Sequence, residues 1–184
     1  PDTGSTTYAY DDAGNRVGQS DARGVQTIYR YDATNRLLFI EYPSEPAKNT
    51  EFRYDQSHAD CALEERNGKA RLTEMIDASG SSQFCYDRHG NLTRKLQITQ
   101  GRSLELRNRY STADRWMGMT YPSGLEVSVT RDPLGRIQTA TASYQGTSIP
   151  LVTNMQYRPF GPVQSIAFDN GQSLTKEWDQ NYWP

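Results

Sequence analysis

The sequence has few of the features that most directly indicate a function. Its 184 residues include only two cysteines, Cys61 and Cys85, whereas a secreted domain held together by disulfides has more cysteines in a shorter chain. The longest apolar run is the four residues 37–40. That run is too short for a transmembrane helix or a signal peptide, so neither is predicted within these residues.

The charges also lack a pattern. The chain carries 20 basic and 22 acidic residues, a formal net charge of −2, and the two signs are interspersed. Without a basic stripe to neutralise phosphates, we expect neither nucleic acid nor an anionic membrane surface as a partner. The 12 tyrosines argue against disorder, because disordered chains are poor in aromatic residues.

One short phrase, Tyr-Asp-x-x-Gly-Asn, recurs along the chain. It is complete at 10–15 ("YDDAGN") and 86–91 ("YDRHGN"), and degenerate copies lie between and beyond. Taking the residue after the aromatic as an anchor, the anchors are Asp11, Asp32, Asp55, Asp87, Ser111, Asp132, Arg158 and Asp179. The intervals are 21–26 residues except for 32 between Asp55 and Asp87. The period predicts an array of about eight repeats over 1–184, a fragment of a longer chain, with an insertion near 56–65.

A second set of turn sequences, such as "DARG" (21–24) and "YPSG" (121–124), lies halfway between anchors. Each repeat should therefore be two strands of about six residues, and no stretch of useful length shows helical periodicity. The sequence predicts an all-β chain, with about sixteen short antiparallel strands in one curved sheet. The segment 56–70 is the expected exception, as a bulge or a helical turn.

The residues of the phrase are those that build turns. Asp at the first position accepts hydrogen bonds from backbone N–H groups further on, and Gly or Asn three residues later takes a left-handed conformation. The aromatic residue before the anchor is expected to pack across its hairpin, which stabilises by about 0.2–1 kcal/mol per pair. The predicted structural turn residues are Tyr10, Asp11, Gly14, Tyr31, Asp32, Asn35, Tyr54, Asp55, Tyr86, Asp87, Gly90, Asp132, Gly135, Tyr157 and Gly161.

Catalytic and metal motifs are not apparent. The potential zinc ligands His58, Asp60, Cys61, Cys85 and His89 lack paired short spacing, and the evenly spaced Asp residues lack the nine-residue, glycine-dense period of calcium-binding rolls. No nucleophile elbow or P-loop occurs. We expect no enzyme activity, no metal and no cofactor. Pairing of the two cysteines stays open, with Cys85 favoured as an ordinary strand residue.

The three tryptophans, Trp116, Trp178 and Trp183, suggest an alternative. Aromatic side chains on a β surface can stack on sugars, so a carbohydrate-binding face is the main rival function. All three lie at or near anchors, where packing within the repeats is the simpler interpretation.

Several phrases together resemble one known family. "YDDAGNR", "YDRHGNLTRK", "GKARLTEMIDASGS", "MTYPSGLEVSVTRDPLGRI" and "YRPFGPVQSIAFDNG" are similar to bacterial Rhs proteins, the YD-repeat family shared with Tc-toxin C components and animal teneurins. The resemblance covers essentially the whole chain. "DPLG" (132–135) resembles part of the family's self-cleaving core, but it falls on the repeat period, so no autoproteolytic role is assigned to Asp132.

The resemblance implies a long β-sheet that spirals into a hollow shell, or cocoon, which encloses a variable C-terminal toxin domain in bacterial members. On that basis the chain is expected to be a non-catalytic wall segment of a secreted or exported bacterial effector. Its expected partners are neighbouring repeats, the enclosed toxin domain and secretion-machinery proteins. The alternative is a surface or secreted repeat module that binds carbohydrate or protein.

Overall fold

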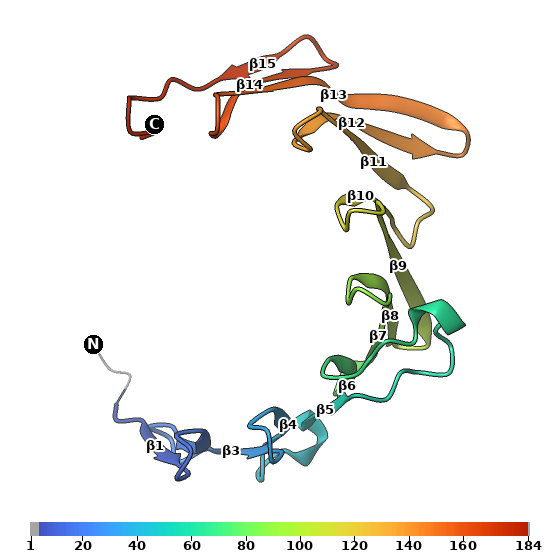
Figure 1. The fold of residues 1–184 in the computed structure, drawn as a ribbon. Helices are drawn as coiled ribbons and strands as arrows, with labels where there is room; N and C mark the ends of the chain where they lie inside the picture. The colour runs from blue at the N-terminus through green and yellow to red at the C-terminus, as the bar shows by residue number, and fades with distance from the viewer. Residues whose placement is uncertain (1–3, 184) are drawn as a thin grey trace. The chain divides into compact units, whose positions relative to one another are not determined.

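The computed structural model describes residues 4–183, and the chain divides between Glu105 and Leu106 into two compact units. In the first unit each strand pairs antiparallel with the strand that follows it in sequence (Figure 1). The strands are β1 (Thr7–Tyr10), β2 (Arg16–Ser20), β3 (Gln26–Tyr31), β4 (Leu37–Glu41), β5 (Thr50–Tyr54), β6 (Leu72–Asp77), β7 (Gly80–Tyr86) and β8 (Leu92–Thr99). Two short 3₁₀ helices interrupt them, η1 (Pro46–Lys48) and η2 (Leu63–Glu65).

The second unit repeats the same order of pairing. The boundary falls within β9 (Arg102–Tyr110), and the strands that follow are β10 (Trp116–Thr120), β11 (Glu126–Arg131), β12 (Ile137–Tyr144), β13 (Thr147–Tyr157), β14 (Val163–Phe168) and β15 (Ser173–Thr175). The described residues thus form 15 antiparallel strands, one fewer than the rough number expected, with no α-helix. The predicted all-β antiparallel fold is confirmed.

The turns after the anchors share one geometry. In the turn after Asp32, the Asn35 N–H donates to the Asp32 carbonyl oxygen at 3.0 Å, and Asn35 has a positive φ of 62°. This is a type I turn closed by a left-handed residue, a common hairpin connection. The same position has a positive φ at Gly14, Gly90 and Gly135.

Gly161 is an exception, and the expectation that it is left-handed is wrong. There the positive φ of 57° belongs to Phe160, which follows Pro159, an order typical of a type II turn. Glycine at 161 instead leaves room for a neighbouring aromatic ring. A Cβ atom at this position would lie 2.6 Å from Cε1 of the Tyr182 ring.

The insertion lies inside the turn that begins at Asp55. Tyr54 pairs with Leu72, a separation of 18 residues instead of the six that separate Tyr31 from Leu37, so the turn gains 12 residues. The turn still closes, because the Ala70 N–H donates to Oδ1 of Asp55 at 2.7 Å and Ala70 takes the left-handed φ of 61°. We call residues 56–69 the excursion; they contain η2, the helical turn expected in this part of the chain.

The excursion covers the most buried part of the described chain. Seven of the eight side chains that are almost fully buried lie between Cys61 and Leu96. Cys61 forms a disulfide with Cys85 of β7 across a Cα–Cα distance of 5.6 Å, and each is 2% exposed. The favoured interpretation of Cys85 as an ordinary strand residue is therefore wrong. The pairing could not be inferred from sequence because it depends on how the excursion folds back onto β7.

The turn geometry predicts a difference between two variants of Gly14. A Cβ atom at Gly14 meets nothing within 4 Å, so its φ of 83° is the only constraint. Gly14→Val should lower the free energy of unfolding by about 1–2 kcal/mol, and Gly14→Asn by less, because Asn tolerates the left-handed region. Denaturant unfolding followed by circular dichroism measures both. Equal losses would contradict the proposed role of φ. At Gly90 a Cβ atom would also lie 2.0 Å from Nη2 of Arg71, so Gly90→Val should cost more than Gly14→Val.

Candidate functional site

Seven of the repeats carry a β-bulge directly opposite the residue before the anchor. Arg30 pairs with Phe39 and Tyr31 pairs with Leu37, so Leu38 is an extra residue in the second strand. The same shift occurs opposite Tyr10, Tyr54, Tyr86, Tyr110, Arg131 and Tyr157. A bulge disrupts the hydrogen-bond ladder locally, so its backbone groups need other partners.

The next repeat supplies that partner. The Tyr54 hydroxyl donates to the carbonyl oxygen of Leu37, the first bulge residue of the preceding repeat, at 2.9 Å. The described residues contain six bonds of this kind, at distances of 2.6–3.0 Å: Tyr31 to Arg16, Tyr54 to Leu37, Tyr86 to Leu72, Arg131 to Trp116, Tyr157 to Ile137 and Trp178 to Val163. We call this series the donor ladder.

All six donors occupy the position before an anchor. Tyrosine fills it four times, and where it is absent the guanidinium of Arg131 or the indole N–H of Trp178 donates instead. Sequence reasoning missed this role and assigned the aromatic to packing alone. The signal was present in the substitutions: phenylalanine never fills the position, although the chain contains five. Only residues with a side-chain donor can complete the bond.

Cationic side chains cover several of these rings. The guanidinium carbon of Arg36 lies 4.5 Å from the ring centroid of Tyr54, and Arg136 lies at the same distance from Tyr157. Such contacts stabilise by about 0.5–1 kcal/mol at exposed sites. Burial raises the pKa of the Tyr54 and Tyr157 phenols, which keeps these hydroxyls protonated as donors at neutral pH.

The turns are also joined to one another by side chains. Arg36 donates through Nε to Asp32 of its own turn at 2.7 Å and through Nη1 and Nη2 to Asp55 of the next turn. Asn15 similarly donates to Asp11 and to the side chain of Asn35. In the second unit, Arg136 donates to Asp132 and to the Arg158 carbonyl oxygen. Each of these side chains therefore links two successive repeats.

The carboxylates of the anchors Asp11, Asp32 and Asp87 are held in the ionised form. The pKa of Asp32 lies well below its usual range, because the backbone N–H of Arg36 donates to it, as do the Thr34 hydroxyl and the Arg36 guanidinium. The side-chain amide of Asn15 is the largest cause that lowers the pKa of Asp11. In Asp87 hydrogen bonds to Asn91 and His89 outweigh desolvation, and the pKa is again lowered. These three carboxylates act as hydrogen-bond acceptors rather than as proton carriers.

The other candidates do not assemble into a catalytic or metal site. Within residues 4–183, no three His, Cys, Asp or Glu side chains gather where they could hold a metal ion. Trp116 donates to Asn108 and Trp178 belongs to the donor ladder, whereas Trp183 is 71% exposed. Over the same residues, no helix has the length and apolar character needed to cross a membrane.

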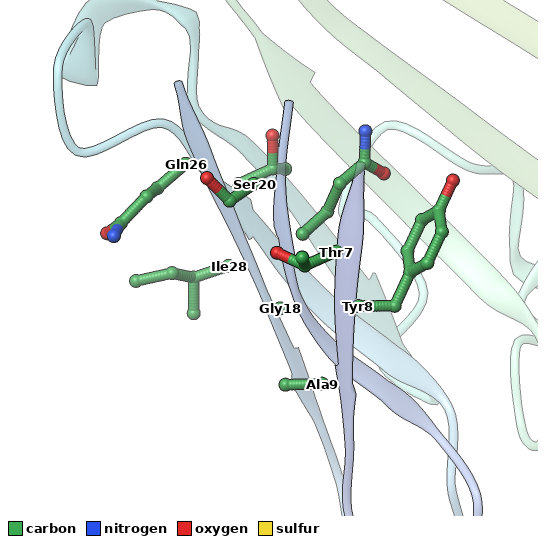
Figure 2. Close-up of a pocket in the computed structure, with 9 residues that line it drawn as sticks. Thr7, Tyr8, Ala9, Gly18, Ser20, Gln26 and Ile28 are labelled. Atoms are coloured by element: carbon green, nitrogen blue, oxygen red, sulfur yellow. The ribbon is translucent and has the colours of Figure 1, made fainter. Parts of the chain in front are cut away.

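One surface hollow, shown in Figure 2, lies across β1, β2 and β3 and has a volume of about 280 Å³. Gly18 has no side chain to fill the hollow, and its neighbours in the register, Ala9 and Ile28, are apolar. Figure 2 shows Tyr8 pointing away from the face that carries Ala9 and Ile28. None of its nine lining residues carries a carboxyl, imidazole or thiol group, so the hollow offers no acid–base chemistry.

The fold and the donor ladder define a β-sheet protein built from tandem hairpin repeats. Residues 10–41 match the family model described as RHS Repeat. No curated protein sequence matches the chain. The chain therefore contains an Rhs repeat, and its resemblance to the Rhs family is confirmed.

Solved structures share the fold at low sequence identity. The crystal structure of TcdB2-TccC3 is similar with a TM-score of 0.76 at 13% identity, over 97% of this chain and 10% of that chain. Those of TcdB2-TccC3-Cdc42 and of TcdB2-TccC3 without its hypervariable C-terminal region each give a TM-score of 0.74 at 14% identity, with the same coverage. The chain thus spans about a tenth of the length of these structures, and the likeness shows a common fold.

The donor ladder predicts that losing one hydroxyl destabilises the array. Tyr54→Phe keeps the ring under Arg36 but leaves the Leu37 carbonyl oxygen without its donor, which should cost about 1–3 kcal/mol. Urea unfolding curves of the variant and the parent measure the difference. Tyr8→Phe is the control, because Tyr8 is 51% exposed and lies outside the ladder. If the two variants lost equal stability, the ladder would not be the cause.

The lowered pKa of Asp32 predicts acid sensitivity. A carboxyl group whose folded pKa is depressed stabilises the fold above its unfolded pKa of about 3.9, and this contribution is lost as the pH falls toward the folded pKa. The melting temperature should therefore fall below about pH 4, and less steeply in Asp32→Asn. Asp12→Asn, which removes none of the bonds to Asp32, should keep the parent's pH profile. An unchanged profile in Asp32→Asn would contradict this prediction.

Proposed function

We propose that this chain is a non-catalytic wall segment of an Rhs-type shell that encloses a C-terminal toxin domain. In this proposal residues 1–184 form one array of about eight repeats within a longer protein. The anchor and turn residues predicted from the sequence are its structural elements. The observation that carries the proposal is the donor ladder, because the same bond joins one repeat to the next whether the donor is Tyr, Arg or Trp.

The low burial of the chain supports a wall rather than a compact domain. Only 35% of the residues are hydrophobic, and eight described side chains are almost fully buried. Strand side chains alternate between the two faces of a sheet. A wall has water or cargo on both faces, so its stability must come from contacts within the sheet. The donor ladder and the ion pairs between turns are contacts of that kind.

The similar structures support a shell with a separate cargo. One of them is TcdB2-TccC3 without its hypervariable C-terminal region, so that protein has such a region. By analogy, the partners of this chain would be neighbouring repeats, an enclosed toxin domain and secretion-machinery proteins. The disulfide between Cys61 and Cys85 supports export from a bacterial cell, because disulfides persist in oxidising environments outside the cytosol.

Limited proteolysis of the full-length parent protein tests containment. The C-terminal domain should be cleaved much more slowly inside the intact parent than when it is expressed alone, because the wall keeps protease away. A parent with a protease site engineered into the wall serves as the control. Its C-terminal domain should lose its protection once the wall has been cut. Equal cleavage rates for the enclosed and free domains would exclude containment.

A further inference from the structure

The wall function does not explain the excursion. Six residues separate Tyr31 from Leu37 across an ordinary turn, whereas 12 further residues are inserted into the turn that begins at Asp55. The inserted residues fold back onto β7, and the only two cysteines in the sequence, Cys61 and Cys85, join them to that strand. An insertion with its own covalent link indicates a role separate from the donor ladder.

Few apolar contacts hold the excursion against the sheet. Cys61 is 2% exposed, but Leu63, the largest apolar side chain of the excursion, is 78% exposed. The two alanines, Ala59 and Ala62, are exposed as well. Burial of apolar surface is the main force that holds one segment of a protein against another. Without the disulfide, the excursion would therefore be held only weakly.

The surface that the excursion covers is polar. Gln83 is 5% exposed and lies 2.9 Å from the His58 ring, measured between their side-chain nitrogens. Arg94 is 8% exposed and donates through Nη1 to the Asp60 carbonyl oxygen at 2.9 Å. Water can replace these partners once the excursion moves away, so little free energy opposes its opening.

The disulfide opposes that opening. It joins residues that are 24 positions apart and thereby limits how far the excursion can move from β7. Both cysteines are 2% exposed, so their sulfur atoms lie in a closely packed site. Two thiols need more room than two bonded sulfur atoms, because they stay at van der Waals distance. Reduction therefore adds a steric repulsion at the point where the excursion meets the strand.

We propose that the Cys61–Cys85 disulfide is a redox-sensitive switch that holds the excursion closed and releases it on reduction. A thiolate of the reductant attacks one sulfur atom and displaces the other cysteine as a thiolate, which leaves a mixed disulfide. A second thiol of the reductant then attacks the mixed disulfide and displaces the first cysteine. The two reductant thiols become a disulfide, and their two protons pass to Cys61 and Cys85.

The environment of the chain sets the state of this switch. The reductant reaches the buried sulfur atoms when the excursion opens transiently, which its weak polar contacts permit. Cytosolic thiols such as glutathione keep cysteines reduced, whereas oxidising compartments preserve disulfides. The excursion is therefore closed in an oxidising compartment and open in a reducing one. This inference does not rest on the wall function.

The switch leaves the sheet intact, because other bonds close the turn that carries the excursion. The Ala70 N–H donates to Oδ1 of Asp55 at 2.7 Å, and the Asp55 N–H donates to the Arg71 carbonyl oxygen at 3.1 Å. Neither bond involves the excursion. The movement is thus confined to residues 56–69.

Trypsin cleavage after Arg66 tests the switch. In the closed excursion the Arg66 guanidinium donates to the carbonyl oxygens of Ala59 and Cys61, which withholds it from the protease. Reduction with dithiothreitol, without denaturant, should speed this cleavage roughly tenfold or more, because opening frees the side chain. Cleavage after Arg23 is the internal control and should not change, since that side chain is already 81% exposed. Equal rates of cleavage after Arg66 in the oxidised and reduced chains would overturn the proposal.

Amide hydrogen exchange measures how far the opening extends. The Asn67 N–H donates to the Tyr86 carbonyl oxygen at 3.2 Å. Its exchange should become roughly tenfold faster or more on reduction. The Ala70 N–H should keep its protection, since Asp55 still accepts its hydrogen bond. Loss of protection at both amides would show that reduction unfolds the whole repeat, and that outcome would contradict the proposal.

The double variant Cys61→Ser/Cys85→Ser removes the bond without a reductant. Trypsin should cleave it after Arg66 at the rate of the reduced chain, and dithiothreitol should have no further effect. Cleavage as slow as in the oxidised chain would refute the switch. If the variant does not fold, the reduced chain with its native cysteines supplies the same comparison.

Thiol labelling shows whether the switch responds to a reductant in the folded state. Dithiothreitol without denaturant should make Cys61 and Cys85 reactive with iodoacetamide, as counted by mass spectrometry. A folded chain that releases no thiols would refute the switch and make the disulfide a permanent link.

Discussion

The hydrogen bond from the residue before each anchor to the bulge of the preceding repeat is the interaction on which the described architecture depends. A bulge bends its strand and removes a carbonyl oxygen from the regular ladder. Leaving such a group unpaired costs about 1–3 kcal/mol. Because the side chain of the next repeat supplies the missing donor, the defect of one repeat becomes the attachment point of the next. Tyr54 on Leu37 and Trp178 on Val163 show the same solution with different chemistry.

Much of the fold could be predicted because the signals that define it are local. The type I turn at Asp32 and the left-handed residue at Asn35 follow from side-chain chemistry within five residues. The donor ladder was missed because its partners, such as Tyr157 and Ile137, lie 20 residues apart and belong to different repeats. Gly161 was assigned the wrong conformation because Pro159 changes the turn type, and its tight contact with Tyr182 is not local.

The structure of the excursion also could not be predicted from the local sequence. Its position was visible as a break in the period, but its structure depends on contacts with strands that follow it. Cys61 meets Cys85 and His58 meets Gln83 only because Asp55 and Ala70 preserve the turn while the intervening residues fold back onto β7. No spacing rule in the sequence specifies that direction of folding.

The hydrogen bonds between successive repeats and the contacts of the excursion have separate roles. Bonds between repeats act along the array, and each joins only immediate neighbours, so a repeat can acquire an insertion without disturbing the next one. The turn at Asp55 illustrates this tolerance. Asp55 still accepts hydrogen bonds from Nη1 and Nη2 of Arg36, and the Tyr86 hydroxyl still donates to the Leu72 carbonyl oxygen just beyond the excursion. The array can therefore carry an insertion in one repeat while the same bonds continue on either side of it.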